Sequence, residues 1–437
     1  MDAQDQDGSG GRPVGRRWLA RTGALMAMVL LAAPACGGGD GFEAEARAEV
    51  PRSVASETDA GPAVTANDAL AVDLYRGLAA ADDANLIFSP YSITIALAMT
   101  RNGAMGDTRA EMDRVLHAPP GTDLDRGLNA LDGSLTARNG ERGPEERRGE
   151  VILRSANALW AQQGLPFEQP FLDTMAAEYG AGVALVDYRT DATGARRSIN
   201  AWVSERTEEK IPELVPDGAI DDRTRLVLTN AVYFKAPWVE AFGLMGDQPF
   251  RTADGSTVSV PTMVGGEGGR YGEGPGWKAA SLRYLGDELS MVVIVPDDLS
   301  AFEAGLDATT LVEITGGLDG QLAAITMPTF RFRSQVRLKD QLTAMGMPLA
   351  FSDAADFSAM TTAEQLKIAD VVHEGFIAVD EEGTEAAAAT AVVMQAVSGP
   401  VGENLVADRP FLFAIRDDAT GALVFLGRVT DPSATSD

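Results

Sequence analysis

Cysteine and histidine, the side chains that most often carry nucleophilic or metal chemistry, are scarce in this chain of 437 residues. Cys36 is the only cysteine, and His117 and His373 are the only histidines. Three such residues far apart in sequence supply neither a thiolate cluster for zinc nor the nucleophile, base and acid of a hydrolase. No GxSxG, Walker-type or HExxH motif accompanies them. We therefore expect no catalytic residue, no bound metal and no cofactor.

The stretch DEEGTEAAAAT, from Asp380 to Thr390, begins a pattern that suits insertion into a β-sheet rather than catalysis. Alternate positions from Thr384 to Ala396 are small or apolar, and the charged and amide groups lie between them. A segment that enters a sheet as a strand needs this period of two, and Gly383 offers a pivot before it. Because Ala and Glu also favour helices, a solvent-facing helix is the alternative.

The composition bounds the class of protein. Hydrophobic residues make up 45% of the chain and charged residues 23%, which suits a globular protein with a large core. The formal net charge is −28 at pH 7. An excess of negative charge repels phosphate backbones, so we expect no nucleic-acid partner.

The N-terminus predicts export. Several arginines precede the apolar stretch ALMAMVLLAAPAC, which is too short for an ordinary membrane span and ends in small residues before Cys36. This order resembles a bacterial lipoprotein signal, although Ala33 stands where leucine is usual. We expect residues 1–36 to be a signal peptide with lipidation of Cys36, and residues 37–66 to be a flexible acidic linker. The protein would be anchored to the cell envelope or surface by that lipid alone; an ordinary secretory signal is the alternative.

Periodicity predicts helices early in the chain and strands late. Leu70, Leu74 and Leu78 recur every four residues, and SITIALAMTRNGA has the apolar content of a buried helix. Thr108 and Glu111 are spaced as a capping box. The absence of a regular alternation favours an α+β fold. Strand-like runs follow in this order: TRLVLTNAVYF, ELSMVVIVP, AAITMPTFRFR, FIAVDEE, FLFAIRD and ALVFLGRV.

Several blocks of the chain resemble the serpin family and stand in the family's order, from about residue 67 to 432. They are NLIFSPYSITIALAMTRNGAMGDTRAEM, LRSANALWAQQGLPF (similar to the third main-sheet strand), INAWVSERTEEKIPELV with TRLVLTNAVYFKAPW, VVHEGFIAVDEEGTEAAAAT, and VADRPFLFAIRDDATGALVFLGRVTDP. The resemblance implies an α+β serpin fold with three β-sheets, eight to nine helices and an exposed reactive-centre loop. It places the serpin domain at 67–433 and leaves 434–437 as a tail.

The resemblance also implies the activity of a suicide-substrate inhibitor. A protease cuts the exposed loop, which then inserts into the central sheet and carries the acyl-linked protease with it. With these blocks in register, a loop able to become a strand is favoured over the helix. Its hinge would be Glu381, Glu382, Gly383, Thr384, Glu385, Ala386, Ala387, Ala388, Ala389 and Thr390.

Carried over from the family, the scissile bond lies between Val397 and Ser398, and Ala396–Val397 is the rival position. Cleavage between Gly399 and Pro400 is disfavoured because proline lacks an amide hydrogen. A small aliphatic residue before the bond suits an elastase-like or subtilisin-like serine protease outside the cell. We expect the inhibitor to be a monomer.

Two further sites carry over from the resemblance. Trp238 matches the breach, the top of the sheet where insertion begins. Many members pair the first hinge acid, here Glu381, with a basic residue; this chain has Thr329 at that position, and Arg331 or Arg333 is left open as a substitute. The shutter, a polar cluster beneath the opening point of the sheet, would be Ser89, Ser92, Asn230 and His373.

The alternative function is a non-inhibitory serpin that acts as a binding or structural module and whose loop is only cut. The small residues of the hinge favour the inhibitor. A serine hydrolase is disfavoured by the missing nucleophile motif and the scarcity of histidine.

Overall fold

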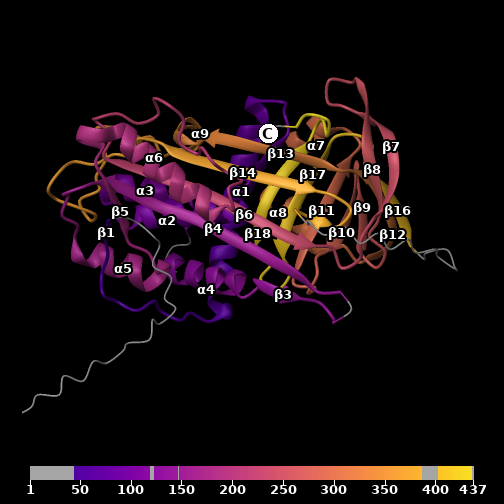
Figure 1. The fold of residues 1–437 in the computed structure, drawn as a ribbon, viewed down its shortest axis with the longest axis horizontal. Helices are drawn as coiled ribbons and strands as arrows, with labels where there is room; N and C mark the ends of the chain where they lie inside the picture. The colour runs from indigo at the N-terminus through magenta and orange to yellow at the C-terminus, as the bar shows by residue number, and fades with distance from the viewer. Residues whose placement is uncertain (1–43, 119–122, 146, 386–401, 436–437) are drawn as a thin grey trace, which may run out of the picture. The chain divides into compact units, whose positions relative to one another are not determined.

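The computed structural model describes residues 44–118, 123–145, 147–385 and 402–435. All of them belong to one compact unit, residues 40–437. This unit is built around two large sheets with helices packed on them (Figure 1). Nine α-helices occur in the described residues: α1 (Gly61–Ala81), α2 (Pro90–Arg101), α3 (Gly106–Val115), α4 (Leu124–Thr136), α5 (Gln169–Tyr179), α6 (Tyr188–Arg206), α7 (Leu299–Gly305), α8 (Ala308–Gly316) and α9 (Lys339–Ala344). Two 3-10 turns accompany them, η1 (Glu57–Asp59) and η2 (Leu349–Phe351).

The main sheet is mixed. Most neighbouring strands are antiparallel, but β4 with β5 and β6 with β14 are parallel. Helices cover both of its faces (Figure 1), and β6 and β14 are buried along their parallel stretch, as is usual for parallel strands. Its order is β1 (Glu45–Ala46), β5 (Val183–Val186), β4 (Gly149–Gln162), β6 (Leu226–Pro237), β15 (Gly383–Thr384), β14 (Val371–Val379) and β13 (Phe330–Arg337), with β3 (Gly140–Arg142) against β4.

The second sheet joins two halves that the resemblance expects as separate sheets. Two residue pairs between β9 and β12 link them, Gly320 with Tyr271 and Gln321 with Arg270. The three expected sheets therefore correspond to the main sheet and to the two halves of one ten-stranded sheet. Its order is β2 (Leu86–Phe88), β18 (Leu423–Val429), β17 (Phe411–Asp417), β11 (Leu289–Pro296), β10 (Trp277–Arg283), β9 (Arg270–Gly274), β12 (Gly320–Pro328), β8 (Thr257–Gly265) and β7 (Gly243–Arg251), with β16 (Glu403–Val406) parallel to β12.

Strand parity divides the core into two clusters on opposite faces of the main sheet. Leu228 and Val232 of β6 pack in the large cluster with α2, every residue of which is buried. Val227 and Ala231, the alternate residues of the same strand, pack in a smaller cluster with Trp202 of α6. Because successive side chains of a strand point to opposite faces, α2 and α6 lie on opposite sides of β6 (Figure 1).

The described fold begins earlier than the sequence suggests, so the predicted linker 37–66 is wrong for the part that the structure describes. β1 pairs with β5, Arg52 lies 2.5 Å from Asp132, and α1 already starts at Gly61. This segment has few large apolar residues: it attaches by backbone pairing, polar contacts and small buried alanines such as Ala60, Ala63 and Ala66, which give only a weak hydrophobic pattern. The predicted capping box is also wrong: α3 begins at Gly106, before Thr108.

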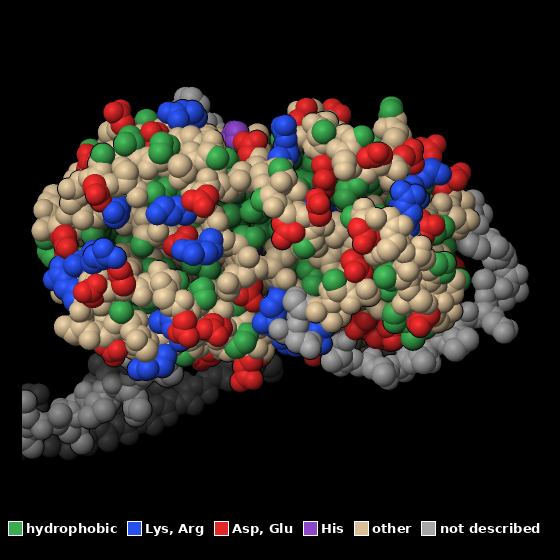
Figure 2. All heavy atoms as spheres, turned by 90° about the horizontal axis from the view of Figure 1, so that it is seen from above, with side chains coloured by type: hydrophobic (Ala, Val, Ile, Leu, Met, Phe, Trp, Pro, Cys, Tyr) green, Lys and Arg blue, Asp and Glu red, His purple; other side chains and the backbone are tan. Residues whose placement is uncertain are grey.

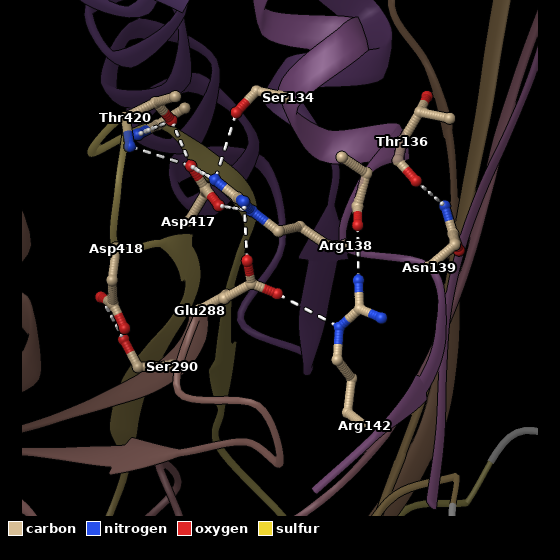
Figure 3. Close-up of polar contacts among 12 residues, drawn as sticks. Ser134, Thr136, Arg138, Asn139, Arg142, Glu288, Ser290, Asp417, Asp418 and Thr420 are labelled. Carbon is tan, nitrogen blue, oxygen red and sulfur yellow. Dashed lines mark hydrogen bonds and ion pairs between the residues drawn. The ribbon is translucent and has the colours of Figure 1, made fainter. Parts of the chain in front are cut away.

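A buried ion-pair network fixes the end of α4 to two turns of the second sheet (Figure 3). Arg138 Nε donates to Asp417 at 2.7 Å, and Arg138 Nη1 donates to Glu288 at 2.9 Å. Asp417 is fully buried and also accepts from the amide and hydroxyl of Thr420 at 2.9 and 2.6 Å. The hydrogen bond to Asp417 is the main cause that raises the pKa of Arg138. The network satisfies two charges that burial would otherwise penalise heavily.

The outer strand of the second sheet, β7, is irregular. Its pairing with β8 shifts register between Leu244 and Gly246, and Gly246 has a φ of 76°. Leu244 and Met245 are 60% and 49% exposed. Pro249 lies further along the same strand and has no amide hydrogen to offer.

The surface is mixed in charge. On the face shown in Figure 2, acidic and basic side chains lie interspersed rather than in separate areas. Within the described part of the chain, no helix is both long and apolar enough to cross a bilayer.

Candidate functional site

The two central strands of the main sheet, β6 and β14, part from each other halfway along. Their parallel register runs from Val371 opposite Leu228 and ends at Gly375 opposite Val232. Further up, the two-residue strand β15 lies between them: Thr384 is paired with Ala236 on one side and with Val379 on the other. The start of the predicted hinge is thus already a strand in the gap.

Gly383 shows how closely the hinge fits this gap. A Cβ atom added at Gly383 would lie 2.3 Å from the carbonyl oxygen of Ala236 and 2.7 Å from the Cα of Pro237. Both neighbours are backbone atoms that cannot rotate away. The position therefore needs glycine for close backbone approach, in addition to the pivot that the sequence suggested.

Trp238 and Tyr284 hold the first part of the hinge. The indole of Trp238 stacks on the ring of Tyr284 with centroids 4.5 Å apart, and its Nε1 donates to the Asp380 carbonyl at 3.0 Å. The backbone amide of Trp238 donates to the Glu382 carbonyl at 2.9 Å. The hydroxyls of Tyr284 and Thr384 share a hydrogen bond of 2.6 Å, and burial raises the pKa of Tyr284. Thr384 is buried and faces the core, in agreement with the predicted parity.

The chain turns out of the sheet at Glu385. Its φ is 50°, in the left-handed region that non-glycine residues rarely adopt. The parity argument expected this side chain on the outer face of the sheet; the structure pairs it there with Lys210, and its side chain is only 12% exposed. Lys210 also lies over the ring of Phe376, at 5.7 Å from the centroid.

The two arginines considered as partners of Glu381 lie at other contacts. The guanidinium of Arg331 lies over the Phe376 ring at 5.4 Å, and Arg333 lies 3.7 Å from Glu374. The backbone carbonyl of Glu381 accepts from the Phe242 amide at 2.8 Å.

The four shutter residues meet in one buried cluster below the gap. His373 of β14 lies opposite Asn230 of β6, and its Nδ1 contacts the Asn230 Oδ1. Its Nε2 accepts from the backbone amide of Ser89 at 3.0 Å, so Nδ1 carries the hydrogen. Burial lowers the pKa of His373 to about 3, and the imidazole is neutral at physiological pH. The Ser89 hydroxyl in turn caps α2 at the Ser92 amide, at 3.2 Å.

Sequence reasoning missed the third strand of this cluster. Asn157 of β4 lies opposite Asn230 and accepts from its Nδ2 at 2.7 Å. It also accepts from the Ser92 hydroxyl at 2.5 Å and donates to the Ser155 hydroxyl at 2.6 Å. The available signal was one amide between Ala156 and Ala158 in a predicted strand. The cluster thus ties α2 to three neighbouring strands, and parting β6 from β14 must break the Asn230–His373 contact.

The geometry is that of a sheet whose two central strands pair at one end and are separated at the other by the start of the hinge. His373 contacts the Ser89 amide and the Asn230 side chain, and among the described residues no serine hydroxyl is hydrogen-bonded to either of its nitrogens. Within the described ranges, no three metal-ligating side chains lie close enough to share an ion. His117 is exposed and lies 2.7 Å from Asp73. Other predicted site residues lie outside the described residues: Cys36, Ala386, Ala387, Ala388, Ala389, Thr390, Val397 and Ser398.

Comparison with known proteins agrees with this architecture. Residues 65–432 match the family model described as serpin (serine protease inhibitor). An uncharacterised serpin-like protein of Thermococcus kodakarensis is 38% identical over 388 residues, which cover 87% of this chain and 88% of that protein. The human leukocyte elastase inhibitor is 34% identical over 383 residues, covering 84% and 99%.

Solved structures give the same result. The crystal structure of Serpin48 from the insect Tenebrio molitor superposes with a TM-score of 0.73 at 28% identity, covering 84% of this chain and 98% of that one. The thermophilic serpin tengpin in its native state gives a TM-score of 0.75 at 25% identity, covering 89% and 97%. Family model, relatives and fold coincide over nearly the whole described unit. The chain belongs to the serpin family, which comprises protease inhibitors rather than enzymes.

Proposed function

We propose that this serpin is a suicide-substrate inhibitor of extracellular serine proteases of the elastase-like or subtilisin-like kind. The observation that carries the proposal is β15: Gly383 and Thr384 already occupy the gap between β6 and β14. The sequence beyond Thr384 keeps small or apolar residues at the core-facing parity as far as Ala396. Cleavage of the loop would free one end of this segment and let it extend β15 downward.

The predicted bond supports the choice of protease. Val397 before the cut is a small aliphatic residue, which fits a shallow apolar primary pocket. Several relatives of this chain are named leukocyte elastase inhibitors, from human, cattle and pig, at 34–36% identity. A protease with a deep acidic pocket would find no basic partner at this position.

The site of action rests on the N-terminal sequence. The arginines, the short apolar stretch and Cys36 support export and lipid anchoring, with the inhibitor held at the cell envelope or surface. There it would meet proteases outside the cell.

Incubation with elastase-, subtilisin- and trypsin-like proteases, followed by denaturing gels, tests the function. We expect a denaturant-resistant complex with one of the first two. Thr384→Arg should give cleaved inhibitor without complex, because a charge would have to enter the core. Ala387→Arg, at the opposite parity, is the matched control and should still form the complex. If the wild type is cut by all three proteases and traps none, the inhibitor proposal is refuted in favour of a binding or structural module.

A further inference from the structure

We propose that Lys210 is a positioning residue for the hinge. Its ammonium group holds the Glu385 carboxylate on the outer face of the main sheet and thereby keeps Thr384 in the gap. The consequence for trapping rests on the proposed inhibitory function; the consequence for the position of the hinge does not.

Lys210 stands on a well-anchored connection between α6 and β6. Its backbone amide donates to the Thr207 carbonyl at 2.9 Å, and the following amide, of Ile211, donates to the Thr207 hydroxyl at 3.2 Å. Ile211 and Leu214 are fully buried, and Gln335 of β13 donates to the Leu214 carbonyl at 3.1 Å. The ammonium group is therefore presented from a backbone that is fixed to the sheet.

The Glu385 carboxylate lies in a place where it needs a cation. Its Oε1 pairs with Lys210, while its Oε2 is buried and has no hydrogen-bond partner among the described residues. Tyr233 lies beside the carboxylate but offers only a neutral hydroxyl: after burial, the negative charges of Glu385 and Glu208 and a side-chain hydrogen bond to Glu385 raise the pKa of Tyr233. Arg154 is already paired with Glu208. Without Lys210, the carboxylate would sit poorly solvated beside a second acid, and leaving the sheet would relieve it.

The backbone conformation of Glu385 depends on the contacts of this residue. The residue holds a left-handed conformation while its amide donates to the Ala378 carbonyl at 2.7 Å. Left-handed backbone at a non-glycine residue persists only where surrounding contacts impose it. Among the described residues, the ion pair with Lys210 is the charged contact of this side chain, and it acts on the residue directly after Thr384. Loss of the ion pair should release Glu385 first and Thr384 with it.

For the inhibitor, a seated Thr384 means that the inserting strand is already nucleated when the loop is cut. The acyl link to the protease is open to hydrolysis until insertion is complete. A hinge that has left the gap must re-enter before the strand can grow, so more molecules are released as cleaved product. Lys210 therefore favours trapping over turnover without touching the protease.

Hydrogen exchange of the intact protein measures the position of the hinge directly. Lys210→Met should raise exchange of the amides at 383–385 at least tenfold. Gly383→Ala is the reference for a displaced hinge, since its Cβ would collide with the Ala236 carbonyl. Lys210→Arg should resemble the wild type. Arg154→Met removes the pair with Glu208 on the same connection and is the matched control, with the hinge expected to remain protected.

Charge reversal separates the pair from a general effect on folding. Lys210→Glu and Glu385→Lys should each expose the hinge, and the double variant should restore its protection. With a protease that the wild type traps, Lys210→Met should raise the number of inhibitor molecules consumed per trapped protease several-fold. If Lys210→Met leaves the exchange unchanged while Gly383→Ala raises it, the role of Lys210 is refuted. If exchange rises but the wild type traps nothing, the hinge contact stands and the inhibitory function fails.

Discussion

The shutter histidine should make the stability of this protein depend on pH in a way that one substitution can isolate. The native pKa of His373 is about 3, against 6.5 for an ordinary histidine, because the imidazole is fully buried and neutral. The unfolded chain therefore binds a proton at His373 before the native protein does. Stability contributed by the neutral ring is fully present above pH 6.5 and is lost as the pH falls from 6.5 towards 3.

The size of the effect follows from linkage. Below pH 6 the loss approaches about 1.4 kcal/mol for each pH unit. Between pH 7.5 and pH 5 the free energy of unfolding should fall by about 2 kcal/mol through His373 alone. Asp68 acts in the opposite direction: burial raises its pKa to about 6 in the native protein, so it adds stability as the pH falls from 6 towards 3.8. In the wild type, the contributions of His373 and Asp68 to the pH dependence of stability partly cancel, so neither can be measured directly.

His373→Gln separates them. Glutamine keeps an acceptor for the Ser89 amide and a donor for the Asn230 carbonyl oxygen, but it does not titrate. The variant retains Asp68, whose contribution cancels when the two proteins are compared.

Urea unfolding of both proteins from pH 5 to 7.5 gives the test. The difference in free energy of unfolding should be constant above pH 7 and should shrink by about 2 kcal/mol by pH 5. Parallel curves across this range would refute the assignment of a neutral, fully desolvated His373.

Three further outcomes are expected. Arg138→Met should lower the free energy of unfolding in urea by about 3–5 kcal/mol, because it leaves the buried Asp417 charge without its cation. Arg142→Met removes only a pair to the part-exposed Glu288 and should lower it by less than about 1 kcal/mol. Similar losses in both variants would contradict the buried-pair argument. A single cut in the loop should raise the thermal midpoint, since the freed segment gains main-chain hydrogen bonds and burial in the sheet; an unchanged or lowered midpoint would mean that the fold is kept without its switch. Mass spectrometry of the mature protein should find a lipid on Cys36 at the N-terminus, and an unmodified terminus elsewhere would remove the anchor.

The sequence predicted the strands that consist mainly of apolar residues. Apolar runs placed β6, β11, β17 and β18 correctly, because most of their residues are apolar and buried. β14 begins at Val371, before the run FIAVDEE, because the polar residues His373 and Glu374 are buried there and interrupt that signal. β1 has no such signal, because it is only two residues long and neither side chain is a large apolar one.

The candidate site could be predicted only where the family resemblance points to individual residues. The resemblance supplied Ser89, Ser92, Asn230 and His373, and the structure places them together. Asn157 and Lys210 were missed because their roles depend on partners 73 and 175 residues away, which one sequence does not pair. The capping box of Thr108 and Glu111 was predicted wrongly for the same reason, because both side chains bind backbone amides far away in the sequence. Thr108 accepts from the Asp356 amide at 2.9 Å, and Glu111 accepts from the Leu349 amide at 2.8 Å.

The irregular outer strand β7 has a consequence for how this protein behaves at high concentration. A straight sheet edge offers a row of unpaired amides and carbonyls on which another chain can dock and from which fibrils can grow. In β7 the register shift at Gly246 bends that row, and Pro249 removes one donor from it. Leu244 and Met245 are exposed directly beside the bend, where no flat edge continues to seat a second strand. Together with the mutual repulsion of copies that each carry a net charge of −28, these irregularities should oppose edge-to-edge association in a protein whose proposed function requires its main sheet to accept a strand of its own.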